Sequence, residues 1–138
     1  MKNYELFDHT ADIGVRVTGR DLPELFKNAA LAMFDIIAEK NNPQPSREEK
    51  IKIIQKADSV DELFINWLNE LLSLSATKEL VFYDFQVQGL DEQNLKAVAT
   101  GYPAINYRFN AEIKAATYHQ LKLEQTKSGW QAEVVFDV

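Results

Sequence analysis

The chain contains no cysteine, which excludes disulfide bonds, a thiolate nucleophile and zinc sites with thiolate ligands. It also has no apolar run long enough to span a membrane, and no basic and then apolar leader after Met1. We therefore expect a cytoplasmic protein without membrane association. With 138 residues the chain can build one proper core but not two, so residues 1–138 are predicted to form a single domain.

Positive charge is scarce as well. The chain has 15 Lys and Arg residues against 21 Asp and Glu residues, which gives a net charge of −6. Proteins that bind nucleic acids neutralise the phosphates with Lys and Arg. Because acidic residues outnumber basic ones in this chain, no direct binding of nucleic acid is expected. An acidic surface suits a cation, or a partner protein with a basic surface.

The sequence lacks the motifs of the common catalytic sites. It contains no Gly-Lys-Ser/Thr phosphate loop, no dinucleotide-binding glycine pattern, no His-Glu-x-x-His and no serine elbow. No standard pairing of a nucleophile with a base is present either. An enzyme that acts alone would need a metal site here, and we expect that the chain is not itself an enzyme.

Two segments have the pattern of amphipathic helices. Asp21 and Glu24 form a capping box, and the apolar residues that follow repeat at helical spacing until the predicted end near Glu39. Ser59 and Glu62 form a second capping box before another apolar stripe. Both helices are predicted to bury one face.

The remaining segments mostly alternate apolar and polar residues, as strands do. Strands are expected at residues 4–7, 13–17, 51–55, 80–89, 94–101, 113–117, 119–125 and 130–137. Turns are expected at 91–94 and 127–129, whereas 102–110 is a loop without an assigned structure. The predicted fold class is α+β, with both helices on one face of a mixed, mostly antiparallel sheet. The order strand, helix, strands occurs twice and suggests a duplicated unit.

Polar residues gather between Phe7 and Gly14, where an apolar strand begins. Two interpretations stay open for this segment. Asp8 and Thr10 can bond to their own backbone in a reverse turn. Alternatively, residues such as Asp12 can be presented as ligands at the edge of a rigid strand.

The last strand runs directly into Asp137 and Val138. The carboxylate of Asp137 therefore lies near the main-chain oxygens of Val138, and hard cations such as calcium and magnesium bind clusters of oxygen atoms. If this strand lies beside the one that starts at Asp12, these oxygens could surround one cation. The alternative is an aspartate that is simply solvated.

Lys114 interrupts an apolar segment, Ile113–Thr117. It is either a surface lysine whose stem packs on the strand or a positive charge that faces a phosphate or an acidic group. His9 and His119 could be ligands or hydrogen-bonded structural residues. Asn66, Asn69 and Glu70 lie on or beside the apolar face of the second helix. Either at least one of them bonds a neighbouring loop, or all three border the solvent.

Several segments taken together resemble the archease family. In chain order they are His9–Gly14, Trp67–Leu72, and Ile113–His119 followed by Val135–Val138. The resemblance covers essentially the whole chain, with the motifs in the family's order. It implies a strand-helix-strand-strand module into which a second, similar unit is inserted.

The resemblance also implies a function. Archeases assist the RtcB-type RNA ligase, a GTP- and manganese-dependent enzyme of tRNA splicing and RNA repair, by promoting its guanylylation. They carry one divalent cation, commonly taken to be calcium, with magnesium and manganese as alternatives. Carried over by position, the ligands are Asp12, Asp137 and Val138. Lys114 matches a lysine that the family needs, and with His9 it would contact the partner or a phosphate.

The chain departs from the family pattern in two places. The Tyr102–Asn110 segment is short and lacks a histidine, and Ala116 stands where valine is common. Two other functions also stay open at this point. One is a metal-dependent phosphate-ester hydrolase or nucleotide-binding enzyme that acts alone, and the other is a general chaperone.

Overall fold

The computed structural model describes residues 3–9, 12–41 and 47–138, without the side chains of residues 8 and 9. Two antiparallel sheets make up most of the fold. The first contains, in spatial order, β1 (Tyr4–His9), β2 (Asp12–Gly19), β9 (Gly129–Asp137) and β8 (Ala115–Thr126). The second contains, in spatial order, β4 (Glu49–Lys56), β6 (Asn94–Pro103) and β5 (Leu80–Leu90).

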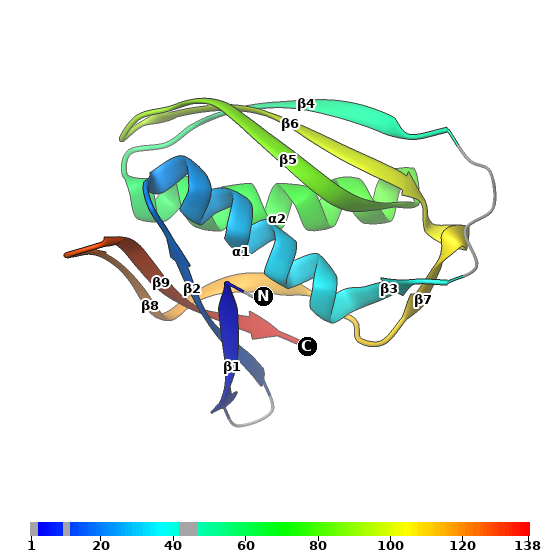
Figure 1. Cartoon of the computed structure of the whole chain (residues 1–138), viewed down its shortest axis with the longest axis horizontal. Helices are drawn as coiled ribbons and strands as arrows, with labels where there is room; N and C mark the ends of the chain where they lie inside the picture. Colours follow the sequence, from blue (N-terminus) through cyan, green and yellow to red (C-terminus); the bar gives the residue numbers. More distant parts are fainter. Residues whose placement is uncertain (1–2, 10–11, 42–46) are drawn as a thin grey trace.

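The helices α1 (Leu22–Ile37) and α2 (Val60–Lys78) lie between these two sheets (Figure 1). Each helix contacts strands of both sheets, and their large side chains fill the space between the layers. The largest fully buried side chains include Phe26, Phe64, Trp67, Phe82, Phe85 and Phe136. Burial of apolar area on this scale is the main stabilising contribution to the fold.

The α+β fold class with mostly antiparallel pairing is confirmed. The prediction of a single sheet covered on one face is wrong, since the strands form two large sheets with the helices between them. A helix covered on both sides must bury more than one narrow stripe. In α1 the buried residues accordingly occupy a wide arc: Leu25, Phe26, Asn28, Ala29, Ala30, Ala32, Met33, Phe34 and Ile37.

The topology contains the same module twice, as the doubled element order suggested. The first module consists of β2, α1, β8 and β9, and the second consists of β4, α2, β5 and β6, inserted between α1 and β8. The strand order is β2-β9-β8 in the first and β4-β6-β5 in the second, which is the same order for equivalent strands. The insertion of one module into the other brings β2 and β9 together from opposite ends of the chain.

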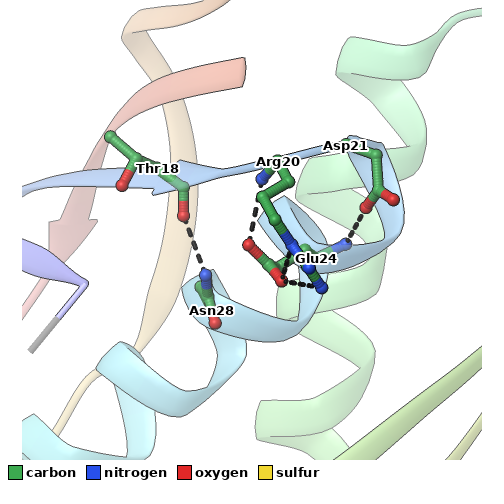
Figure 2. A network of polar contacts seen from close by, with 5 residues as sticks. All are labelled: Thr18, Arg20, Asp21, Glu24 and Asn28. Atoms are coloured by element: carbon green, nitrogen blue, oxygen red, sulfur yellow. Dashed lines mark hydrogen bonds and ion pairs between the residues drawn. The ribbon is translucent and has the colours of Figure 1, made fainter. Parts of the chain in front are cut away.

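Each helix begins with the predicted cap. At α1, Asp21 Oδ1 accepts a hydrogen bond from the Glu24 N–H at 2.9 Å, and Glu24 Oε1 accepts one from the Arg20 N–H at 3.0 Å (Figure 2). At α2, Ser59 Oγ accepts from the Glu62 N–H at 3.2 Å. The bonds to Asp21 and Ser59 satisfy N–H groups that the first helical turn leaves without partners, and the bond from the Arg20 N–H to Glu24 holds the residue before the cap.

The end of the first helix differs from the prediction near Glu39. The first helix ends at Ile37, because Ala38–Lys40 forms β3 and pairs with β7 (Tyr107–Phe109). The second helix extends to Lys78 and is closed by Glu79 in the left-handed conformation, with φ of 54°. No helix in the described part of the chain is long and apolar enough to cross a membrane.

Two segments of the second half also differ. The unassigned 102–110 segment holds the end of β6, the 3₁₀ turn η1 (Ala104–Asn106) and β7. The two strands expected at 113–117 and 119–125 are one strand, β8, whose pairing with β9 is interrupted by a bulge between Thr117 and Lys122. A bulge interrupts the alternation of side chains, which is why the pattern indicates two strands.

Candidate functional site

The ends of β2 and β9 form the candidate site. The two strands are antiparallel neighbours, and Ile13 pairs with Phe136. Asp12 and Asp137 are the next residues outward on the two strands, so this register puts them opposite each other. Opposite residues of an antiparallel pair have Cβ atoms about 4.5–5.5 Å apart and point to the same face. The strand adjacency that a shared cation site requires is therefore present.

Lys114 joins this end of the sheet through its backbone. Its N–H donates a hydrogen bond to the Asp137 carbonyl oxygen at 2.7 Å, and the next residue, Ala115, pairs with Asp137. Lys114 therefore lies just before β8 and not inside an apolar strand. Its side chain is exposed, as is that of Val138, and both can reach a ligand from solvent.

Phe7 covers the outer face of the sheet next to the two carboxylates. Phe136 belongs to the core, so the alternation of side chains puts Asp137 on the opposite, outer face. On this face the ring of Phe7 crosses Gly14 so closely that a Cβ on Gly14 would lie 2.3 Å from it. Val135, which is only 1% exposed, lies in the same row of the sheet. One flank of the candidate site is therefore apolar.

Charged residues occupy the next part of the outer face. Arg16 forms ion pairs with Glu5 and with Glu133, the latter with an Nε–Oε2 distance of 3.5 Å. Its guanidinium also lies 5.5 Å from the centre of the Phe7 ring. The hydrogen bond from Arg16 to Glu5 raises the pKa of Arg16. Because Arg16 is already engaged by two carboxylates, it is not available to neutralise the acidic end of the sheet.

The donor chemistry of this end suits a hard cation. Asp12, Asp137 and the main chain of Val138 offer only oxygen atoms, which calcium and magnesium prefer. Within the described residues no group of three or more His, Cys, Asp or Glu side chains gathers at metal-binding spacing. The third donor of the expected set comes from the main chain, so the residues present fit a small oxygen site of two side chains and one main-chain group.

The histidines occupy different places. The backbone of His9 pairs with Asp12, so it lies in the row that continues to Asp137, while its side chain is outside the described part of the structure. His119 is exposed and lies in the bulged part of β8. It lies four positions along the strand from Ala115, a distance of about 13 Å at strand spacing. The structure therefore does not bring His119 to the site.

Asn69 contacts this region from the second module. Its Nδ2 donates a hydrogen bond to the Ala116 carbonyl at 3.1 Å, and its Oδ1 accepts one from the Ala116 N–H at 2.7 Å. Of Asn66, Asn69 and Glu70, one of which was expected to bond a neighbouring loop, Asn69 does bond a neighbouring part of the chain. The partner is a strand and not a loop, which no pattern in the sequence could indicate.

Comparison with known proteins decides the family. The model of the archease protein family (MTH1598/TM1083) matches residues 4–138. This chain belongs to the archease family. Protein archease from Methanosarcina mazei is 41% identical over 144 residues, covering 99% of this chain and 97% of that relative. Protein archease from Pyrococcus abyssi is 34% identical, with all of both chains covered.

Solved archease structures share the fold. The solution structure of Methanobacterium thermoautotrophicum protein 1598 has a TM-score of 0.75 and 30% identity, with full coverage of both chains. The crystal structure of a Thermotoga maritima protein, described as an archease and possible chaperone, has a TM-score of 0.66 and 22% identity, covering 96% and 94% of the two chains. The resemblance noted from the motifs is thus confirmed for the whole chain.

The Tyr102–Asn110 segment, which was expected to depart from the archease pattern, borders a cavity of about 640 Å³. Phe109 and Asn110 form one wall of this cavity, and Ile113 borders it on the side of Lys114. The cavity is therefore close in sequence to the candidate site but is lined by different residues. The Tyr102–Asn110 segment contributes Ala104, Phe109 and Asn110 to the lining of this cavity.

Proposed function

We propose that this archease is an accessory protein that activates an RtcB-type RNA ligase by promoting its GTP-dependent guanylylation with the help of a bound divalent cation. The observation that carries the proposal is the register of β2 and β9, which puts Asp12 opposite Asp137. Lys114, bonded through its N–H to the Asp137 carbonyl, supplies a positive charge at the same end.

Different residues would serve the cation and the partner. Asp12, Asp137 and the main-chain oxygens of Val138 would hold the cation, calcium foremost, with magnesium and manganese as alternatives. A bound divalent cation would supply concentrated positive charge for a phosphate or a carboxylate of the partner. Lys114 would orient the same phosphate or partner group, since an exposed ammonium is a flexible point charge. His9, in register with Asp12, is assigned to the same contact.

The charge of the chain supports a protein partner over RNA itself. A net charge of −6 opposes binding to a phosphate backbone, which depends on Lys and Arg. Activation of the ligase by this archease therefore calls for protein contact. The absence of any standard nucleophile-and-base pair in the sequence favours this role over a hydrolase that acts alone.

The test is guanylylation of a purified RtcB-type ligase from the same source under multiple-turnover conditions. Wild-type archease should stimulate the reaction, and the Asp137→Ala variant should not. Glu49→Ala is the matched control, because Glu49 begins β4 as Asp12 begins β2 and the change removes the same charge. It should stimulate like the wild type.

Two other outcomes would replace the proposal. If the wild-type protein does not stimulate the ligase but turns over GTP or a phosphate ester with a metal ion, it is an enzyme in its own right. If it suppresses aggregation of unrelated proteins and the Asp137→Ala variant does so equally, it is a general chaperone. Full stimulation by Asp137→Ala would refute the role of the carboxylate pair.

A further inference from the structure

Asn69 supports the open edge of the first sheet. β8 is the last strand in the order β1-β2-β9-β8, so one side of its backbone has no neighbouring strand within the described part of the chain. The Asn69 amide bonds both the N–H and the carbonyl of Ala116 on this side, at 2.7 and 3.1 Å. A single side chain of α2 therefore takes the place that the backbone of another strand would occupy.

The segment of β8 that Asn69 supports is short, and its regular pairing with β9 stops at Thr117. Ala115, Ala116 and Thr117 pair with β9, after which the register is lost until Lys122. Gln120, inside the interrupted part, has a positive φ of 54°. The start of β8 is thus held by three ladder positions, by the hydrogen bond from Thr117 Oγ1 to the Val135 carbonyl at 2.8 Å and by Asn69, because the irregularity after Thr117 disrupts the ladder.

The same short segment carries the main-chain contact of the candidate site. Lys114 is two residues before Ala116, and its N–H bonds the carbonyl of Asp137. Ala115 pairs with Asp137 directly. A shift of the start of β8 would therefore move Lys114 and the end of β9 relative to Asp12, which belongs to β2 and is not held by Asn69.

We propose that Asn69 is a positioning residue that sets the geometry of the cation site and of Lys114 through the backbone of Ala116. This inference rests on the proposed function, since it concerns the same site. The side-chain amide of Asn69 bonds the backbone of Ala116, two residues after Lys114. It acts by fixing the strand on which the distance between the Lys114 backbone and Asp137 depends.

The chemistry of the amide explains why this position requires asparagine. One donor and one acceptor at the end of a short side chain match the carbonyl and N–H of a single residue. An aspartate at this position can accept from the Ala116 N–H, but its second oxygen would face the Ala116 carbonyl. An alanine would leave both backbone groups of a buried residue without their partner.

The experiment is a calorimetric titration of the full chain with calcium at a temperature where every variant is folded. Asn69→Ala and Asn69→Asp should each weaken calcium binding about tenfold or more, as loss of outer support does at other metal sites. Asn28→Ala is the matched control: Asn28 is 8% exposed, and its Nδ2 donates to the Thr18 carbonyl at 2.8 Å (Figure 2). Thr18 lies at the far end of β2 from Asp12.

The control separates positioning from stability. Asn28→Ala should lower the melting temperature as Asn69→Ala does, yet bind calcium like the wild type. Equal calcium affinity of wild type and Asn69→Ala would overturn the inference and leave the proposed cation site intact. Equal weakening by both variants would also overturn it, because the effect would then be one of general stability. If the wild type binds no calcium, magnesium or manganese, the cation part of the proposed function fails, and the inference fails with it.

Discussion

The two modules share one topology but differ at the end where the first carries the candidate site. In the first module this end presents Asp12 and Asp137 on neighbouring strands. In the second, β6 continues into η1, and Tyr102 stacks on Tyr83 with ring centres 4.9 Å apart and an interplanar angle of 9°. Lys40 Nζ lies 4.9 Å from the centre of the Tyr102 ring. The repeated fold therefore supplies a frame, and the first copy carries the acidic pair where the second carries stacked aromatic rings.

The modules also differ in how a helix of the other module contacts one of their outer strands. The strand is β8 in the first module and β5 in the second. α2 supports β8 through the two hydrogen bonds of Asn69 with Ala116. α1 contacts β5 through an ion pair between Lys27 and Asp84, with an Nζ–Oδ1 distance of 3.4 Å. The first support is part-buried and directional, whereas both ion-pair side chains are 42% exposed. Of these two contacts, only the one between Asn69 and Ala116 lies next to the candidate site.

The largest expected effect distinguishes the acidic end of the first module from the equivalent end of the second. Asp12→Ala should reduce calcium affinity more than about a hundredfold and abolish ligase stimulation, because it removes one of two carboxylates from the proposed set. Glu49→Ala, at the equivalent strand start, should change neither. Calorimetry and the guanylylation assay measure the two effects. Calcium binding by Asp12→Ala at wild-type strength would show that the acidic end of the first module is not a cation site.

The second prediction compares a glycine in each module. A Cβ on Gly101 would lie 2.7 Å from the Val81 carbonyl oxygen, whereas one on Gly14 would lie 2.3 Å from the ring of Phe7. A backbone atom within a sheet cannot move aside, but a ring at the edge of a sheet can. We therefore expect Gly101→Ala to lower the free energy of unfolding by about 3 kcal/mol and Gly14→Ala by about 1 kcal/mol.

Urea denaturation measures both values. Gly14→Ala should additionally change the environment of Phe7, visible as a shift of its ring resonances by NMR, while Gly101→Ala should leave that ring unaffected. A larger loss of stability for Gly14→Ala than for Gly101→Ala would contradict the ordering.

The third prediction concerns the ion pair between Lys27 of α1 and Asp84 of β5. Lys27→Ala should lower the free energy of unfolding by only about 0.5 kcal/mol, because exposed pairs gain little over their hydration. Asn69→Ala should cost about 1–3 kcal/mol, since it leaves two backbone groups without a partner. A double-mutant cycle of Lys27 with Asp84, repeated in high salt, measures the pair. A coupling above about 2 kcal/mol that persists in salt would contradict this view.

The smallest effect is expected in the turn between β5 and β6. The backbone N–H of Gln93 and then the side chain of Asn94 lower the pKa of Asp91 below its usual value of 3.8. Because the pKa is depressed in the folded state, this carboxylate stabilises the protein above pH 3.8, and the contribution is lost as the pH falls further. Asp91→Asn should remove that part of the pH dependence. Urea midpoints of both proteins between about pH 2.5 and 6 test it, and identical profiles would count against it.

Local features of the sequence predicted local structure well. The capping residues Asp21 and Ser59 each accept the expected hydrogen bond, and Thr126 pairs with Gly129 across the expected hairpin turn. The helical pattern gave a wrong prediction where pairing with a distant strand outweighed the local preference for helix. Ala38–Lys40 continues a helical pattern, yet it forms β3 because β7 is available to pair with it. The side chains of Asp8 and His9 and the residues Thr10 and Ala11 lie outside the described part of the chain, so the reverse-turn interpretation of this segment stays a prediction.

The sequence by itself determined where the helices start, which segments alternate as strands, and that no thiol chemistry is available, because each depends on residues close together or on composition alone. Only the tertiary structure decided that Asp12 faces Asp137 and that Asn69 holds Ala116, 47 residues away. Such pairings depend on which strand edges and helix faces meet once the core closes. That choice is made by the packing of all layers at once, and no local pattern encodes it.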